Sequence, residues 1–297
     1  MLSILIPIYN HVCSDLVKDL AKQASEENIP FEIICIDDFS SSLFKEENRI
    51  IKSIPNCIYT ELTENIGRSK IRNLLGEKAQ YEYLLFLDCD SKVIRPNYIK
   101  TYLELLSQTQ IISGGRIYDS FPPTDKNYLL HWKYGTLREP KPTDGQNQVF
   151  MSNNFVIKKS ILEKIPFHEN ITQYGHEDSL FQIDLKQSGY NIQFINNPIM
   201  HIGLETSTDF IKKVKLSTET LWKLYQAGEI NKQDCGNLKL LKTYLTLKKY
   251  KCNSLFSSAY SLCRKLFEKN LFGKRPSLLI LNIYKLCYLS CFRHKKS

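Results

Sequence analysis

The chain has 297 residues, of which 42% are hydrophobic, so it is long enough for one large α/β domain or for one domain with an appendage. No run of about 18 apolar residues occurs, so no transmembrane helix is predicted. The formal net charge is +9, but residues 206–297 hold 19 basic and 5 acidic side chains. The basic character therefore belongs to the C-terminal third alone.

Cysteine usage and the N-terminal segment bear on the compartment. The nine cysteines are odd in number and scattered, and no CxxC pair occurs, which is typical of reduced thiols in a cytoplasmic protein. The N-terminal run MLSILIPIYN has neither a basic region nor a cleavage site, so we predict a strand rather than a secretion signal.

Apolar runs of strand length alternate with helical patterns up to about residue 120. The expected order is strand 2–8, helix 12–24, strand 31–37, strand 56–62, helix 67–79, strand 83–88, helix 96–106 and strand 111–118. This alternation predicts an α/β fold with a Rossmann-like, mostly parallel central sheet that helices cover on both faces. Ligands of such sheets bind beyond the carboxyl ends of the strands, so the polar groups at those ends are the candidates for chemistry.

The pattern changes after residue 120. Irregular structure around a short helix at 129–135 is expected first, and then strand 149–159, helix 160–165, helix 177–187 and strands 191–195 and 198–203. From Ser207 onward the pattern is helical and basic. We therefore place a domain boundary near residue 205, between a domain of residues 1–205 and a basic helical region of residues 206–297.

Two motifs follow early strands. In CIDDFSSS, Asp37 or Asp38 can accept hydrogen bonds from a nucleobase or ribose, although Asp38 and Ser40 can equally cap the next helix. In ENIGRSKIRN, Asn65 and Gly67 form a turn before a basic helix, which suits a phosphate but also an ordinary turn with a solvated basic face.

The segment YLLFLDCD places Asp88 and Asp90 at the end of a strand that is predicted to be buried. Desolvating carboxylates is expensive, so these two side chains need a positive partner. Mg²⁺ and Mn²⁺ prefer such hard oxygen ligands and keep coordination positions open for phosphate oxygens. A metal that carries a nucleotide diphosphate is thus expected here, with a helix-capping aspartate beside a surface aspartate as the alternative.

Two later segments are ambiguous when each is considered alone. Glu177 and Asp178 begin a helix, where the helix dipole favours the ionised form of an acid, and this fits simple capping. His201 lies in an apolar run, as core histidines do.

The ordered set of motifs is more specific than any member. The pieces are SILIPIYN, the IDD of 36–38, NIGRSKIRN, the DCD of 88–90, SNNFVIKK, GHEDSLF and His201. In this order, residues 2–203 resemble the family-2 glycosyltransferases with the GT-A fold. The resemblance covers about two thirds of the chain and does not reach the basic C-terminal region.

The resemblance implies a role for each matching residue. The positions that meet the nucleotide are matched by Pro7, Tyr9, Asp37, Asp38, Asn65, Gly67 and Arg72. Asp88 and Asp90 match the DxD motif that meets the ribose and the metal-bound diphosphate, and His201 matches a metal-ligand histidine found in part of the family. Asp178 matches the general base and Glu177 its acidic neighbour.

Two positions depart from the family pattern. Ser152-Asn153-Asn154 stands where Gly-Gly-Asn is common, which leaves the acceptor contacts open. His176 precedes Glu177 in place of the usual Trp or Gly, and the sequence assigns it no role.

The resemblance implies a metal-dependent, inverting glycosyltransferase that uses Mn²⁺ or Mg²⁺. UDP-sugar is the expected donor by family frequency, and the expected acceptor is a glycan or a lipid-linked molecule in polysaccharide or surface-glycan assembly. A sugar-nucleotide pyrophosphorylase is the enzymatic alternative, but the Gly-rich basic loop that it needs after the first strand is missing. A nucleic-acid-binding protein is the alternative from another class; the basic region carries none of its recognisable motifs, so no nucleic acid is expected.

The basic C-terminal region bears on where in the cell the protein acts. The segment SLLILNIYKLCYLSCFRHKKS at 277–297 is apolar with a basic end. We expect a cytoplasmic protein that is peripheral on the inner face of the cell membrane, with helices of this segment on an anionic surface. The alternative is a helical subdomain packed on the catalytic core.

Overall fold

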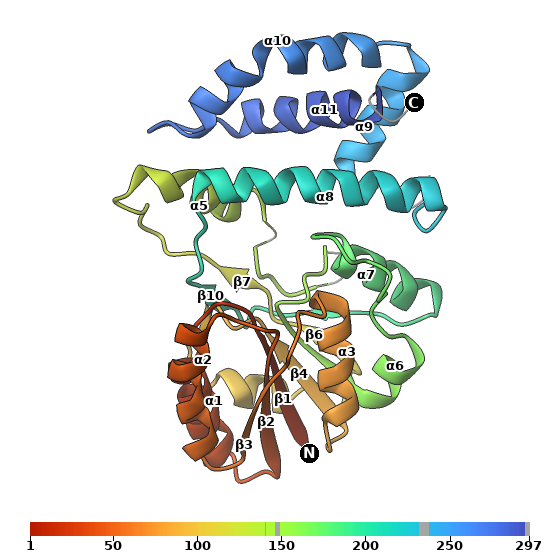
Figure 1. Ribbon diagram of the computed structural model, residues 1–297. Coiled ribbons are helices and arrows are strands. Elements are labelled where there is room, and N and C mark those ends of the chain that lie inside the picture. Colours follow the sequence, from red (N-terminus) through yellow and green to blue (C-terminus); the bar gives the residue numbers. More distant parts are fainter. Residues whose placement is uncertain (140, 146–148, 232–237, 295–297) are drawn as a thin grey trace. The chain divides into compact units, whose positions relative to one another are not determined.

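A computed structural model describes residues 1–139, 141–145, 149–231 and 238–294 (Figure 1). The chain divides into two compact units. The first unit comprises Met1–Asp119, Pro140–Thr172 and Glu177–Gly203, and the second comprises Ser120–Glu139, Gln173–His176 and Leu204–Ser297. The main division at Gly203 lies close to the expected boundary at residue 205, but two earlier segments also belong to the second unit.

The first unit is built on a seven-stranded sheet with the order β3-β2-β1-β4-β8-β6-β9. The strands are β1 (Leu2–Ile8), β2 (Phe31–Asp37), β3 (Cys57–Glu61), β4 (Tyr83–Leu87), β6 (Ile111–Ser113), β8 (Asn154–Lys158) and β9 (Gln193–Phe194). Strands β3, β2, β1 and β4 run parallel, and β8 runs antiparallel to both of its neighbours. The mostly parallel central sheet and its flanking helices confirm the predicted fold class.

A second, three-stranded sheet joins β5 (Ser91–Lys92), β10 (Ile199–His201) and β7 (Arg116–Ile117). It divides the single strand expected at 111–118, because β6 joins the large sheet while β7 pairs with β10. This small sheet brings the chain that follows Asp90 beside His201, which lies more than 100 residues later.

Helices cover both faces of the large sheet, as Figure 1 shows. One face carries α1 (Ser14–Glu26) and α4 (Tyr98–Leu103), and the other carries α3 (Arg68–Lys78), α6 (Lys159–Lys164) and α7 (Glu177–Gln187). Alternate residues of β1 serve the two faces: Ile4 and Ile6 pack toward α1, whereas Leu5 packs in the opposite cluster. The remaining helix of this unit is α2 (Ser42–Asn48), which continues into a 3₁₀ turn at Arg49–Ser53.

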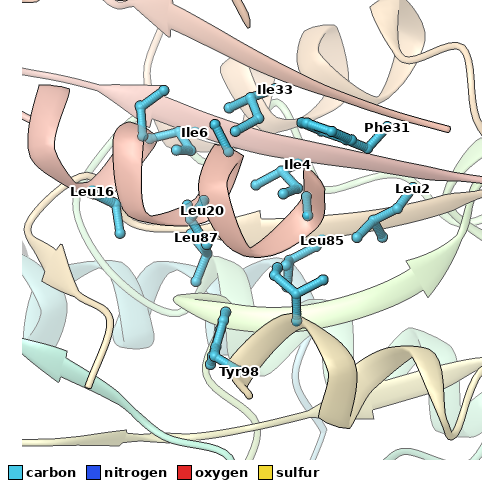
Figure 2. Packing of buried hydrophobic residues seen from close by; sticks show 14 of the residues in the cluster. Leu2, Ile4, Ile6, Leu16, Leu20, Phe31, Ile33, Leu85, Leu87 and Tyr98 are labelled. Carbon is cyan, nitrogen blue, oxygen red and sulfur yellow. The ribbon is translucent and has the colours of Figure 1, made fainter. Parts of the chain in front are cut away.

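Figure 2 shows how the first cluster is assembled. Ile4 and Ile6 of β1 meet Ile33 of β2 and Leu85 of β4, while Leu20 of α1 closes the cluster from the helical layer. These side chains are fully buried and come from three strands and one helix. Close packing of this kind makes the carboxyl ends of the three central strands a rigid base for a site.

The second unit is helical. It contains a 3₁₀ turn at Lys126–Tyr128 and the helices α5 (Leu129–Arg138), α8 (Ser207–Ala227), α9 (Lys239–Lys249), α10 (Asn253–Leu271) and α11 (Leu278–His294). An apolar cluster with Phe210, Leu281 and Tyr284 joins α8, α10 and α11. Across the described parts of the chain, no helix combines the length and apolar content that crossing a bilayer requires. The eight cysteines within those parts are free thiols.

Candidate active site

The carboxyl ends of β1, β2 and β4 meet at one edge of the large sheet, because the three strands are parallel neighbours. Pro7 is the last residue but one of β1 and is partly buried. Tyr9 comes directly after β1, and 56% of its surface is exposed. The structure therefore brings the polar residues after these strands to the same edge, as the sequence predicts for ligand binding.

Asp37 is the last residue of β2 and Asp38 follows it, and the carboxylates of both accept hydrogen bonds from backbone N–H groups. Asp37 Oδ1 accepts from Ser40 N–H at 2.7 Å. Asp38 accepts hydrogen bonds from the backbone N–H groups of Ile66 (2.7 Å) and Gly67 (3.1 Å). The side chain of Asn65 donates to the carbonyl of Asp38 at 2.9 Å. Asp38 and Asn65 thus hold the turn before α3 against the end of β2. The sequence alone had left ligand binding and helix capping as alternatives for Asp38.

The neighbouring turn carries a residue that the sequence analysis missed. Phe39 has a φ of +65°, which is a costly conformation for a bulky side chain, and 52% of its surface is exposed. The turn is held because Asn10 N–H donates to Ser40 Oγ (2.8 Å) and Ser41 N–H donates to Asn10 Oδ1 (2.9 Å). Exposed aromatic rings therefore follow both β1 and β2, and the unusual φ is the signal that marks Phe39.

Arg72 connects two of the expected site residues. It is 3% exposed, and its guanidinium lies 3.0 Å from Asp88 Oδ1 and 3.8 Å from Glu177 Oε1. Arg68 lies 3.3 Å from the same Glu177 oxygen. Burial by itself raises the pKa of Glu177, but the charges of Arg68 and Arg72 outweigh it and leave the pKa below its ordinary value. Glu177 is therefore an ionised partner of two arginines.

Replacing Arg72 by Met should destabilise the protein by about 3–5 kcal/mol, because it removes one of the two arginines beside the buried Glu177 carboxylate and leaves Asp88 without its ion-pair partner. Urea unfolding measures this loss. Arg49→Met is the matched control, since Arg49 makes a bidentate pair with Glu61 at the surface and should cost far less. Adding Glu177→Gln to Arg72→Met should restore part of the loss; strict additivity of the two changes would contradict the network.

Asp178 lies beside this network at the start of α7 and differs from Glu177. Burial and the adjacent Glu177 charge raise the pKa of Asp178 to about 7, although Ser179 N–H donates to its Oδ1 at 2.7 Å. From its place at a helix start we expected the helix dipole to favour the ionised form of Asp178, but burial opposes that effect here. A carboxyl group that titrates near neutrality is well matched to accepting a proton.

Asp90 and His201 form the other polar pair. His201 Nδ1 lies 3.3 Å from Asp90 Oδ1, and Ile202 N–H donates to the Asp90 carbonyl at 2.9 Å. Burial raises the pKa of Asp90, but His201, Arg116 and His11 outweigh it and hold the pKa below its usual range. His11 and Arg116 are thus two further groups near Asp90 that no sequence motif indicated.

Gly203 makes room for Asp90. A Cβ atom at position 203 would lie 2.5 Å from Asp90 Oδ2 and 2.7 Å from its Cβ, which is closer than real Cβ atoms approach. Only glycine therefore fits beside this carboxylate. Spacing in the sequence cannot reveal this need, because Asp90 and Gly203 meet only through the pairing of β5 with β10.

Asp90 and His201 are suited to a divalent cation. A carboxylate oxygen and an imidazole nitrogen that lie side by side are both accepted ligands of Mn²⁺, and Mg²⁺ accepts the carboxylate. Among the described residues no group of three or more His, Cys, Asp or Glu side chains could hold an ion alone. Two protein ligands leave positions for the phosphate oxygens of a ligand, so the residues fit the expected ion. Asp88 has Arg72 as its partner.

The segment Ser152-Asn153-Asn154, which differs from the family pattern, lies beside Asp88. Asn154 is fully buried and its side chain binds the hydroxyl groups of Tyr98 and Tyr102, so it braces the fold. The carbonyl of Asn153 accepts from Asp88 N–H, and its side-chain Oδ1 is buried without a hydrogen-bond partner in the described structure. Asn153 therefore has a polar atom left for a ligand.

His176, which the sequence left without a role, belongs to the second unit. Its Nε2 lies 3.1 Å from Ser217 Oγ of α8. The preceding Gly175 packs on the same serine, because a Cβ there would lie 2.7 Å from Ser217 Oγ. Both residues therefore serve local packing around α8.

Comparison with known proteins identifies similar sequences and folds. The model of the family described as Glycosyl transferase family 2 matches residues 3–166. Chondroitin synthase of Escherichia coli is 33% identical over 108 residues, which are 36% of this chain and only 16% of that protein. The chain therefore matches a small part of this curated relative.

Solved structures share the fold at low sequence identity. The mannosyltransferase PcManGT of Pyrobaculum calidifontis, in complex with GDP-Man and Mn²⁺, aligns with a TM-score of 0.61 and 13% identity over 99% of this chain and 86% of that one. S. aureus TarS 1–349 in complex with UDP aligns with a TM-score of 0.51 and 16% identity over 99% and 91% of the two chains. At such identities the likeness establishes a common fold.

Proposed function

The chain belongs to glycosyl transferase family 2, and on that basis we propose that it transfers a sugar from a nucleotide diphosphate to an acceptor hydroxyl with inversion at the anomeric carbon. The observation that carries this proposal is the pair of neighbouring acids at the start of α7. One of them, Glu177, lies beside Arg68 and Arg72, which keep it ionised, and burial together with the Glu177 charge raises the pKa of the other, Asp178, to about 7. A single base of this kind suits one in-line displacement.

The nucleotide is proposed to lie along the edge where β1, β2 and β4 end. The exposed rings of Tyr9 and Phe39 offer apolar faces for the base, and Asp38 holds the turn that begins α3. Arg72 fixes Asp88 for contact with the ribose side of the donor. UDP is the proposed nucleotide. TarS is solved with UDP and PcManGT with GDP-Man, so the assay below compares donors with different nucleobases.

The diphosphate is proposed to bind Mn²⁺ or Mg²⁺ beside Asp90 and His201. When bound, the ion offsets the negative charge that develops on the leaving diphosphate. Asp90 remains ionised for this task because its pKa is held low, and Gly203 leaves the room that its carboxylate occupies. PcManGT is solved with Mn²⁺, which supports this choice of ion.

Asp178 is proposed to take the proton of the acceptor hydroxyl as the bond to the sugar forms. Burial around Asp178 limits its solvation, and this strengthens its interaction with a hydroxyl donor. Glu177 acts through its charge: it raises the pKa of Asp178 and holds Arg72 and Arg68. The proposed acceptor is a glycan or a lipid-linked molecule, and the proposed place of action is the cytoplasmic side of a membrane.

A donor panel tests the proposal. The protein is incubated with UDP-, GDP- and CDP-sugars, Mn²⁺ and candidate glycan acceptors, and released nucleotide and product stereochemistry are followed by NMR. Turnover of one donor class with an inverted product is expected. A product that retains the donor's anomeric configuration, or binding of no nucleotide diphosphate at millimolar concentration, would contradict the proposal.

A further inference from the structure

Helix α10 carries an exposed row of leucines that no contact within the described chain explains. Its inner face, with Tyr260 and Leu271, is buried against α11 in the apolar cluster of the second unit. On the opposite side Leu255, Leu262 and Leu266 are 68%, 81% and 66% exposed. At 3.6 residues per turn these three residues fall within an arc of about 40°, so they form one row along the helix, the leucine row.

Basic side chains border the leucine row. Lys265 and Lys269 are exposed on one flank of it, and Lys251 is exposed just before the helix begins. Glu268, the acidic residue of this helix, accepts hydrogen bonds from Arg264 and from the hydroxyl of Tyr284. It lies on another side of the helix than the leucine row. The exposed surface of α10 is therefore apolar along its centre and positive along its edge.

We propose that the leucine row is a membrane-contact face, which lays α10 flat on an anionic lipid bilayer. The leucines would enter the boundary between headgroups and acyl chains, and the long lysine stems would let their charges reach the anionic headgroups. The site does not depend on the proposed transferase activity. If both hold, the face keeps the enzyme where lipid-linked acceptors are found.

The proposed membrane-contact face lies on α10, whereas the sequence led us to expect it at residues 277–297. Residues 277–297 were expected on the membrane, but Leu278, Leu281, Tyr284 and Leu289 of α11 are buried within the second unit. Helix α11 packs against α10 and α8, and Figure 1 shows α11 between these two helices of the second unit. The more apolar helix thus forms the core, and the more amphipathic one presents the contact face.

The composition of the row favours lipid over a second copy of the chain. A stable protein interface buries about 800 Å² on each partner and is depleted in lysine, whereas three leucine side chains supply much less area and have lysines at their border. A bilayer needs no shaped partner surface. It also attracts each of these lysines through its negative surface potential.

Liposome flotation of the full chain tests the proposal. Vesicles of phosphatidylcholine with 30% phosphatidylglycerol should float the protein at about 0.1 M salt, and pure phosphatidylcholine vesicles should not. Leu262→Ser with Leu266→Ser should weaken partitioning at least tenfold. Lys265→Glu with Lys269→Glu should weaken it similarly, and the remaining binding should depend less steeply on salt.

The matched control is Leu43→Ser, which removes a similarly exposed leucine from α2 in the first unit and should float like the wild type. As a second readout, Leu262→Trp should show a blue-shifted emission only with anionic vesicles. Wild-type protein that fails to float at low salt, or a double serine variant that floats unchanged, would overturn the proposal. So would self-association that the double serine variant abolishes while the wild type ignores vesicles.

Discussion

Replacing Asp178 by Asn is expected to lower kcat about 10²–10⁴-fold while leaving donor affinity within about twofold. The amide cannot accept the acceptor's proton, and a positioned general base contributes an effect of this size. Donor binding depends on other residues, because Asp178 lies at the start of α7 whereas the proposed nucleotide edge is built by β1, β2 and β4. Steady-state kinetics and calorimetry with the nucleotide diphosphate separate the two effects.

A loss of stability does not explain the lower kcat of the Asn variant, because the Asp178 carboxyl group destabilises the folded protein at high pH. The pKa of Asp178 in the folded protein, about 7, lies above its unfolded value, so its contribution to stability is complete below pH 4 and is lost as pH rises through 7. The Asn variant escapes this loss and should be at least as stable as the wild type at pH 8. A variant that is less stable at pH 8, or that retains near-normal turnover, would contradict the role of Asp178.

The same carboxyl group should set the pH dependence of the reaction. With saturating Mn²⁺, kcat/KM should fall tenfold per pH unit on the acid side of an apparent pKa near 7, because only the ionised base accepts a proton. Glu177→Gln should move this inflection to lower pH, since it removes the negative charge that raises the pKa of Asp178 and leaves Arg68 and Arg72 facing it. An unmoved inflection would assign the titration to another group.

The fold could be predicted because its signals are local. The apolar runs of β1, β2 and β4 are buried on both faces, so they appear in the sequence as continuous rather than alternating patterns. The segment at 111–118 could not be divided correctly, because its two glycines permit a break but only the distant β10 decides where β7 goes. Likewise, nothing local assigns residues 120–139 to the second unit.

The site could be predicted as a set of positions, but not as a set of contacts. The sequence indicated Asp38 and Asp90 by their places after strands. Asp38 is occupied by backbone N–H groups of a turn 28 residues later, and the surroundings of Asp90 come from residues that are scattered along the chain. The partner of α11 could not be predicted either. The apolar character of this segment indicates that it is buried, but not whether a membrane or the protein itself buries it.

Replacing Asp90 by Ala should abolish the dependence of nucleotide diphosphate binding on Mn²⁺ and weaken that binding at least about 100-fold in the presence of the ion. The alanine removes the carboxylate that lies 3.3 Å from His201, and the loss of even an outer partner of a metal ligand typically costs 10–100-fold in affinity. Calorimetry with UDP, in Mn²⁺ and in excess EDTA, measures both quantities. Wild-type affinity that EDTA leaves unchanged would refute the metal assignment.

Two further variants decide whether Asp90 acts at the ion or only supports the fold. Gly203→Ala keeps every ligand but pushes a Cβ to 2.5 Å from Asp90 Oδ2, so it should displace the carboxylate and weaken Mn²⁺-dependent binding with little effect on binding in EDTA. Asp19→Ala removes an exposed aspartate of α1 and should change neither value. If Gly203→Ala lowers binding equally with and without Mn²⁺, Asp90 shapes the pocket rather than holding the ion, and the metal must depend on other groups.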